Sequence, residues 1–559
     1  MITTMVLWLL FFVLPIAYTT QLVDNFVVIK WIVVYVVGVL FSLQILLQGG
    51  PFRRPIRVFT GIGLAFLVFR AVLLVSQRTF AMEWYGFLDG LLFLWLCGCV
   101  YHLAQRGNLN LNQIRLPFFW GLSFVLARSV FHFIQSRFVE GYFRADAFSS
   151  SFGNINMLAE YLVLTIPLLV YYCQSKDQDE RKRLVSLILF AASLFVLVWG
   201  RSRSSWLGLV LVGGYYLKAK QWRKSHFLIA GSIGVLTLML QFYWSDGELN
   251  FVQKGKVSSN SARWSLVQSS LELIREKPFG IGTELFEFYI APYRVNTERP
   301  QDESVLDRSP HNEFLRWGVE YGWFYLAGVF IALSLLMWRI IKFREPLFIG
   351  ILLAFIPQLA FQFPFQNAFP FGFAALMLGL FMSSEARSSD RSGIGELSPW
   401  FTRIVASLML GLIGVTLILF ISSKYDEVHS MQDLARSERA CQIYPVNWRS
   451  CINVAQNYFN QEKHKESLEV LYKELERHPF NIIALRFAVL NQLKLGNEAL
   501  ACEGADVYQS LLAGKGLFGA FFENVCRGQS RFLGLADGDF EKAYFRWIEE
   551  TKMFEASKD

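Results

Sequence analysis

The sequence predicts an all-α fold: a polytopic helical membrane protein with about 12 or 13 transmembrane helices, followed by a small helical soluble domain. Of its 559 residues, 54% are hydrophobic and 18% are charged, whereas a soluble domain is about 45–50% apolar and about 25% charged. Apolar runs of about 20 residues, long enough to cross a bilayer, recur through the first three quarters of the chain. The composition therefore excludes a disordered protein, a fibrous protein and an ordinary soluble enzyme.

Hydropathy places thirteen spans along the chain. The N-terminal run lacks a basic region and a cleavage site, so it is expected to be a first span and not a cleaved signal peptide. Prolines interrupt the pair of spans at 346–383, which makes their pattern the least regular. The expected spans cover residues 4–21, 26–48, 57–76, 84–104, 115–135, 153–174, 184–200, 204–217, 227–245, 322–341, 346–362, 367–383 and 403–422.

The distribution of Lys and Arg predicts the orientation in the membrane. One alternating set of loops is much richer in these residues than the short loops of the other set, and the richer set faces the cytoplasm. The N-terminus is then cytoplasmic, and the loop 246–321 and the tail 423–559 lie on the periplasmic side of a bacterial inner membrane. The net charge of +8 reports this orientation, and no basic run suggests a nucleic-acid partner.

A change in composition divides the chain into a transmembrane domain, 1–422, and a soluble tail, 423–559. Pro445–Trp448 and Pro479–Ile482 share the pattern Pro-x-Asn-apolar and lie one tetratricopeptide period, about 34 residues, apart. The tail is therefore expected to be a short, capped tetratricopeptide-like domain that can bind a protein partner. Small, aromatic, small and large residues lie where such a repeat places them: Ala455, Tyr458, Ser467 and Leu471.

The cysteines of the tail suggest disulfides. Cys441, Cys451, Cys502 and Cys526 make an even number in a compartment expected to be oxidising. Four cysteines allow three pairings, and proximity in the chain favours Cys441–Cys451 and Cys502–Cys526. Four buried thiols in helices remain an equally open alternative.

Histidine is the candidate general base. Metalloprotease, Walker A, dinucleotide-binding and nucleophile-elbow motifs are absent,, and the seven histidines lack metal-ligand spacing. Only His132 and His311 are expected on the outer side of the membrane domain. His132 lies between two phenylalanines and is expected to pack at the interface. His311 follows Pro310 at the end of a polar loop, where a neutral imidazole can act as a general base; a helix-capping histidine is the alternative.

Arginines are the candidate anion-binding groups. Arg203 lies in a tight outward turn between serines that leave room for a ligand, whereas Arg201 in the same turn fits an interfacial anchor better,. Arg263 is expected in the first turn of a helix over Ser261–Lys277, where the helix N-terminus favours an anion; a solvated arginine is the alternative. The apolar residues of that helix with a 3.6-residue period are Trp264, Val267, Leu271 and Ile274,.

Five charged residues fall well inside the expected spans, away from the span ends, where they are costly in lipid,. They are expected to face a cavity or a partner, or to form internal ion pairs. These residues are Lys30, Arg70, Asp89, Arg128 and Glu160.

Four segments, in this order, resemble the O-antigen ligase and polymerase superfamily of membrane glycosyltransferases. The resemblance covers roughly residues 140–385, and members of the superfamily often carry a tetratricopeptide tail. The matching segments are Phe152–Leu162, Ser202–Ser204, Arg263-Trp264 with Lys277–Gly282, and Pro310–Leu315 with Glu320–Gly322.

The resemblance implies a C-type glycosyltransferase fold and a metal-independent enzyme without cofactors. Such an enzyme moves a glycan from a polyprenyl diphosphate carrier to a periplasmic lipid or glycan acceptor such as lipid A-core. It implies that Arg203 and Arg263 bind the diphosphate and that His311 is catalytic. Asn312 belongs to the same motif as His311, and Asn312 and Arg201 complete the expected substrate-binding set.

Several alternatives stay open at this stage. A polymerase of O-antigen or exopolysaccharide and a protein O-oligosaccharyltransferase belong to the same superfamily. A lipid-linked glycan transporter would need internal repeats between its halves, and none is apparent in the sequence. A scaffold that only binds partners through its tail would not explain arginines and a histidine on one side of the membrane.

Overall fold

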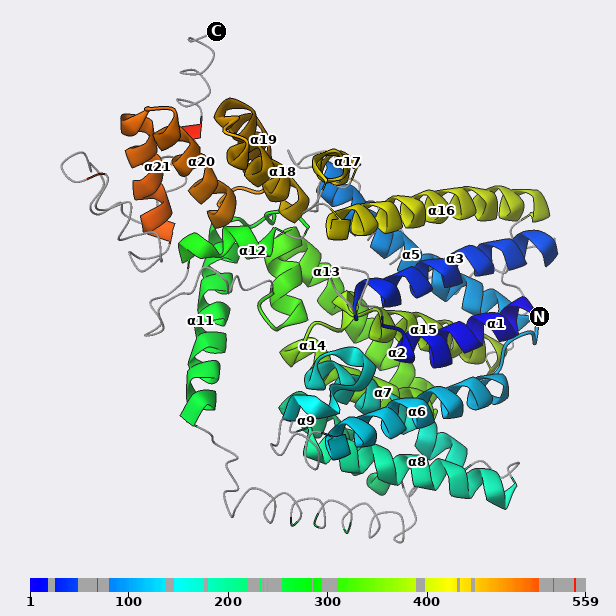
Figure 1. The fold of residues 1–559 in the computed structure, drawn as a ribbon. Helices are drawn as coiled ribbons and strands as arrows, with labels where there is room; N and C mark the ends of the chain where they lie inside the picture. The colour runs from blue at the N-terminus through cyan, green and yellow to red at the C-terminus, as the bar shows by residue number, and fades with distance from the viewer. Residues whose placement is uncertain are drawn as a thin grey trace.

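The computed structural model of the chain is helical, and Figure 1 shows its membrane helices as a bundle with the C-terminal helices beyond one end. Within the part of the chain that the structure describes, no strand forms. Apart from a few single positions, the described residues are 1–18, 26–48, 80–135, 145–174, 179–200, 202–219, 254–283, 285–293, 309–388, 398–429, 433–443 and 448–511.

Among these residues, eight helices are long and apolar enough to cross a membrane. The prediction of a multi-pass membrane protein is therefore confirmed by the length and composition of these helices. The expected spans at 57–76 and 227–245 lie outside the described residues. The eight helices are α3 (Val28–Gln48), α5 (Phe80–Gln105), α6 (Leu111–Ile134), α7 (Ile155–Gln174), α8 (Glu180–Trp199), α13 (Glu313–Phe343), α15 (Ala368–Ser388) and α16 (Pro399–His429).

Shorter apolar helices complete the bundle. The N-terminal run, expected over 4–21, forms α1 (Ile2–Trp8), the π-helical η1 (Leu9–Val13) and α2 (Leu14–Ile16). Two further helices are α9 (Arg203–Lys218) and α14 (Pro346–Phe361). The proline-interrupted pair at 346–383 is helical on both sides of a single break, because Pro346 opens α14 at a position that proline tolerates and Pro364 opens the 3₁₀ turn η5 (Pro364–Gln366).

The helix α7 lies in the middle of the membrane domain. All of its side chains from Leu158 to Val170 are buried, as expected for a helix that is apolar on nearly every face. It packs against α8, α14 and α9. Other large contacts pair α5 with α15, α3 with α16, and α9 with α14, so helices that are distant in the sequence share one core.

The tail forms helices that pack one after another. They are α17 (Leu434–Ile443), α18 (Trp448–Asn460), α19 (His464–Arg477), α20 (Ile482–Lys494) and α21 (Glu498–Leu511). The second copy of the repeated pattern opens α20, since the Asn481 side chain accepts hydrogen bonds from the backbone N–H groups of Ile483 and Ala484, both at 3.2 Å. The pattern thus marks a helix start, while a tetratricopeptide identity stays a prediction.

Two disulfides cross-link these helices. Cys441–Cys451 joins α17 to α18, and Cys502–Cys526 joins α21 to a later part of the chain. The pairing favoured by proximity is therefore confirmed, and the alternative of four free thiols is wrong. Because each bond closes a short loop, each is expected to stabilise the tail by about 3 kcal/mol.

Reduction of the full-length protein is expected to lower the unfolding temperature of the tail, because the unfolded chain regains the freedom that both cross-links remove. Differential scanning calorimetry with and without reductant measures the shift. The variant Cys173→Ser serves as a control, since Cys173 is a free thiol in α7 and its loss should leave the shift intact. Peptide mapping that finds other pairs, or free thiols at these four positions, would contradict the assignment.

Candidate functional site

Arg203 begins α9 directly after a tight turn from α8. The indole of Trp206 closes this turn, since its Nε1 donates a hydrogen bond to the carbonyl of Leu197 at 3.1 Å. Ser202 and Ser204 are buried and their hydroxyl oxygens lie 3.4 Å apart, whereas Arg203 between them is exposed. The turn thus buries the serines and leaves the guanidinium accessible. Arg201 lies outside the described residues.

Arg263 lies well inside α11 (Lys254–Glu276), so the predicted helix start at Ser261 is wrong. Serine lowers helix propensity only modestly, and a polar run without Pro, even one with Gly255 near its start, does not stop a helix,. The helix N-terminus therefore does not attract an anion to Arg263, and any attraction must come from charged side chains.

The apolar period expected along α11 does not coincide with its buried face, although Ile274 belongs to both. Trp264 is 63% exposed and Leu271 is 46% exposed. The buried face contains small serines, one of which, Ser270, donates its hydroxyl hydrogen bond to the carbonyl of Leu266 at 2.6 Å. Because serine can satisfy its hydroxyl within its own helix, a hydrophobic period misses such a face. The buried residues of α11 are Ser265, Leu266, Ser269, Ser270, Leu273 and Ile274.

Arg203 and Arg263 lie close enough to interact, although 60 positions of sequence numbering separate them. Burial and the positive charge of Arg203 lower the pKa of Arg263. Both guanidinium groups are positively charged, so they repel each other where water only partly screens them. Guanidinium groups bind phosphate through two parallel hydrogen bonds, so an anion between them would offset this repulsion.

His311 precedes α13 in an unusual backbone conformation. Its φ is 50°, in the left-handed region that non-glycine residues rarely adopt and that costs of order 1–3 kcal/mol. Asn312 is the helix cap, since its side-chain oxygen accepts a hydrogen bond from the backbone N–H of Leu315 at 3.0 Å. The alternative of a helix-capping histidine is therefore wrong. Backbone strain of this kind is characteristic of functional positions.

A short connector between α14 and α15, Gln362–Asn367, joins His311 to the start of α9. The rings of Phe363 and His311 lie 5.6 Å apart between centroids. The neighbouring Gln362 places its side-chain Nε2 3.4 Å from the hydroxyl of Ser204. One segment thus contacts both His311 and the residue that follows Arg203, and its single proline, Pro364, was the local signal that marked it in the sequence.

A glycine-lined crossing connects the end of α11 to α13. The backbone N–H of Ile281 donates to the carbonyl of Val319, and that of Gly282 to the carbonyl of Glu320, both at 3.0 Å. The helix α13 is broken at Gly322, where φ is 83° and ψ is 178°, a region that essentially only glycine adopts. The crossing holds the helix that contains Arg263 against the helix that follows His311.

The variant Gly322→Ala is expected to destabilise the protein by about 2–4 kcal/mol, because its backbone conformation excludes a side chain. A Cβ there would lie 2.3 Å from the carbonyl oxygen of Pro278. Gly328→Ala in the same helix is the matched control, since its Cβ would meet nothing within 4 Å. Thermal unfolding in detergent compares the two, and equal unfolding temperatures would contradict the role of the crossing.

The first turns of α13 contain one positive and two negative side chains that pair with one another. Arg316 forms ion pairs with Glu313 and with Glu320, the latter at 3.4 Å. The carboxylate of Glu313 also lies near the backbone of Phe365 in the connector. These three charges are buried, so they hold α13 and the connector together.

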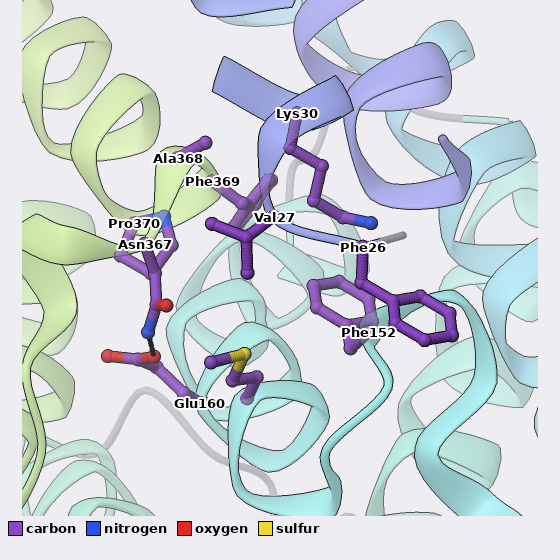
Figure 2. Close-up of a pocket in the computed structure, with 10 residues that line it drawn as sticks. Phe26, Val27, Lys30, Phe152, Glu160, Asn367, Ala368, Phe369 and Pro370 are labelled. Atoms are coloured by element: carbon purple, nitrogen blue, oxygen red, sulfur yellow. Dashed lines mark hydrogen bonds between the residues drawn. The ribbon is translucent and has the colours of Figure 1, made fainter. Parts of the chain in front are cut away.

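A small pocket beside the connector contains two of the charges expected within spans (Figure 2). The amide of Asn367 donates a hydrogen bond to Glu160 Oε2 at 2.8 Å. The other oxygen, Oε1, is buried without a hydrogen-bond partner among the described residues. Lys30 donates to the carbonyls of Ala17 and Ser151 at 2.6 and 2.7 Å. The free space is about 20 Å³, room for one water molecule.

The remaining span charges have internal partners. Tyr35 donates a hydrogen bond to Asp89 at 3.0 Å. Arg128 donates to Nε2 of His132 at 3.2 Å and lies 4.1 Å from the ring centre of Tyr18, which fits the expected packing role of His132. Arg70 lies outside the described residues.

The fold and the site define a multi-pass helical membrane protein in which Arg203 lies near Arg263, and in which one connector contacts both His311 and the turn that contains Arg203. Residues 188–330 match the family model described as O-antigen ligase. The match begins in α8 and ends in α13, so it includes Arg203, Arg263 and His311. It supports the O-antigen ligase superfamily and a membrane glycosyltransferase of the ligase or polymerase type. A comparison with curated proteins found no match.

Proposed function

We propose that the protein is an O-antigen-ligase-like enzyme that moves a glycan from a polyprenyl diphosphate carrier to a periplasmic acceptor such as lipid A-core. The observation that carries this proposal is an arrangement in which Arg203 lies near Arg263 and one connector contacts both His311 and Ser204, the residue after Arg203. Two guanidinium groups suit a diphosphate, and an imidazole suits an acceptor hydroxyl.

The proposed reaction is a single displacement at the anomeric carbon of the donor. The acceptor hydroxyl oxygen attacks this carbon and forms the new glycosidic bond, while the bond to the diphosphate oxygen breaks and its electron pair stays on the diphosphate. His311 accepts the hydroxyl proton. Arg203 and Arg263 offset the charge that develops on the leaving diphosphate. Attack from the face opposite the diphosphate inverts the anomeric configuration.

The orientation belongs to the same proposal. The positive-inside distribution favours a cytoplasmic N-terminus, which puts the loop 246–321 and the tail on the periplasmic side of the inner membrane. The two disulfides support this side, because the periplasm is an oxidising compartment. A C-type glycosyltransferase fold, and a tail that recruits a protein partner, are further parts of the proposal.

Transfer in vitro tests the function. The full-length protein in nanodiscs is given a defined polyprenyl-diphosphate oligosaccharide and one candidate acceptor at a time, and products are identified by mass spectrometry. Glycan attached to lipid A-core is the expected result, and the product linkage reports inversion. Chain growth on a second lipid-linked repeat would identify a polymerase, and transfer to a protein would identify an oligosaccharyltransferase. No transfer to any acceptor would overturn the enzyme assignment.

A further inference from the structure

We infer that the connector Gln362–Asn367 is a positioning element that sets the distance between the general base and the diphosphate-binding arginines. In this inference, Phe363 positions the imidazole of His311, and Gln362 positions Arg203 through Ser204. The inference rests on the proposed function, and it concerns residues beyond the stretch 188–330 that matches the family model.

The connector is fixed at both of its ends. At the first end, the backbone N–H of Gln362 donates to the carbonyl of Gln358 at 2.8 Å, which continues α14. At the other end, Asn367 donates to Glu160 at 2.8 Å, and the indole of Trp31 donates to the carbonyl of Gln366 at 3.1 Å. These contacts reach α3 and α7, so the connector is tied to the core of the bundle.

The middle of the connector is fixed to α13. The backbone of Phe365 lies near the buried carboxylate of Glu313, and the Phe365 ring lies 5.7 Å from the ring of Trp317. Pro364 restricts the backbone directly after Phe363. A residue held on both sides in this way has little freedom to move, which makes Phe363 a firm support for a neighbouring side chain.

Phe363 is inferred to position the proposed general base, His311. Its half-buried ring lies against the imidazole of His311 at 5.6 Å with an interplanar angle of 49°. A contact between rings is worth about 0.5–1.5 kcal/mol, and displacement of a reacting group by about 1 Å can lower the rate about 10²-fold. Loss of this ring should therefore affect the chemical step more than donor binding.

Gln362 is inferred to hold the turn between α8 and α9 that contains Arg203. Its buried side chain reaches the hydroxyl of Ser204 at 3.4 Å, and Ser204 directly follows Arg203 in the first turn of α9. Removing this amide should loosen the turn that presents the guanidinium. Because Arg203 is proposed to bind the diphosphate, the loss should appear in donor affinity and not in the chemical step.

Two variants of the full-length protein separate these roles. Phe363→Ala is expected to lower kcat about 10–100-fold with little change in the donor KM, and Phe363→Tyr, which keeps the ring, should restore most of the rate. Gln362→Ala is expected to raise the donor KM several-fold with kcat nearly unchanged. Phe361→Ala is the matched control, because Phe361 ends α14 and is 49% exposed. Equal effects of all the variants, or a loss in kcat that Tyr does not restore, would overturn the inference.

Two measurements without glycan transfer keep this inference separate from the proposed function. The rate at which diethyl pyrocarbonate modifies His311, followed by mass spectrometry, should rise in Phe363→Ala and stay unchanged in Phe361→Ala. Thermal stabilisation by inorganic pyrophosphate should weaken in Gln362→Ala only. A wild-type protein that transfers no glycan would refute the function, whereas unchanged values in both measurements would refute the positioning role.

Discussion

Replacing His311 with asparagine is expected to lower the rate of glycan transfer about 10²–10⁴-fold, the range that general-base assistance supplies. Asparagine tolerates the left-handed backbone conformation at this position, where φ is 50°. Its amide, however, cannot take up the proton of the acceptor substrate's hydroxyl group. The variant should therefore fold and insert as the wild type does. Initial rates with saturating donor and acceptor, together with the unfolding temperature, measure both properties.

Two further variants make the result on His311 specific. His311→Ala should lose as much activity as His311→Asn, because both remove the base. His132→Ala should keep its activity, since the structure places that imidazole beside Arg128 in α6. A fully active His311→Asn protein would contradict the role of His311 as the base, whatever its stability.

Replacing Arg203 or Arg263 with alanine is expected to weaken donor binding about 10–100-fold, because each hydrogen bond to a charged group contributes about 1.5–3 kcal/mol. Lysine at either position should recover only part of this affinity, since an ammonium group does not make the two parallel contacts of guanidinium. Donor KM and the dissociation constant of inorganic pyrophosphate, obtained by titration of the protein in nanodiscs, measure the effect.

The two arginines should also be coupled in a double-mutant cycle. The positive charge of Arg203 lowers the pKa of Arg263, so either alanine variant relieves a repulsion that exists without ligand. The double variant should then lose less affinity than the two single losses added together. Arg275→Ala is the control, because Arg275 is an exposed cation at the end of the same α11. An unchanged pyrophosphate affinity in Arg203→Ala or Arg263→Ala would remove that arginine from the site.

Properties that depend on neighbouring residues in the chain could be predicted well. Apolar runs located the helices around residues 28–48, 155–174 and 368–388, since burial in a bilayer requires length and hydropathy alone. Proximity identified both disulfides. The expected site residues His311 and Arg203 lie at helix starts in the structure, because Pro310 precedes one helix and Gly200 ends the helix before the other,.

Other features could not be predicted from local patterns. The predicted start of α11 was wrong, and its serine-lined buried face was not predicted, because weak helix propensities yield to packing against α13,. The connector Gln362–Asn367 was not recognised, since its partners Ser204, His311 and Glu160 leave no periodic trace in the sequence.

The sequence by itself determined that this chain is a helical membrane protein and which residues suit anion binding and proton transfer, and it favoured one pairing of the tail cysteines without deciding whether they are cross-linked. Only the tertiary structure decided that Arg203 lies near Arg263, that Phe363 supports His311, and that Asn312 rather than His311 caps α13. The physical reason is that hydropathy and helix period act over a few turns of chain. Contacts between side chains from distant helices depend on how whole helices pack.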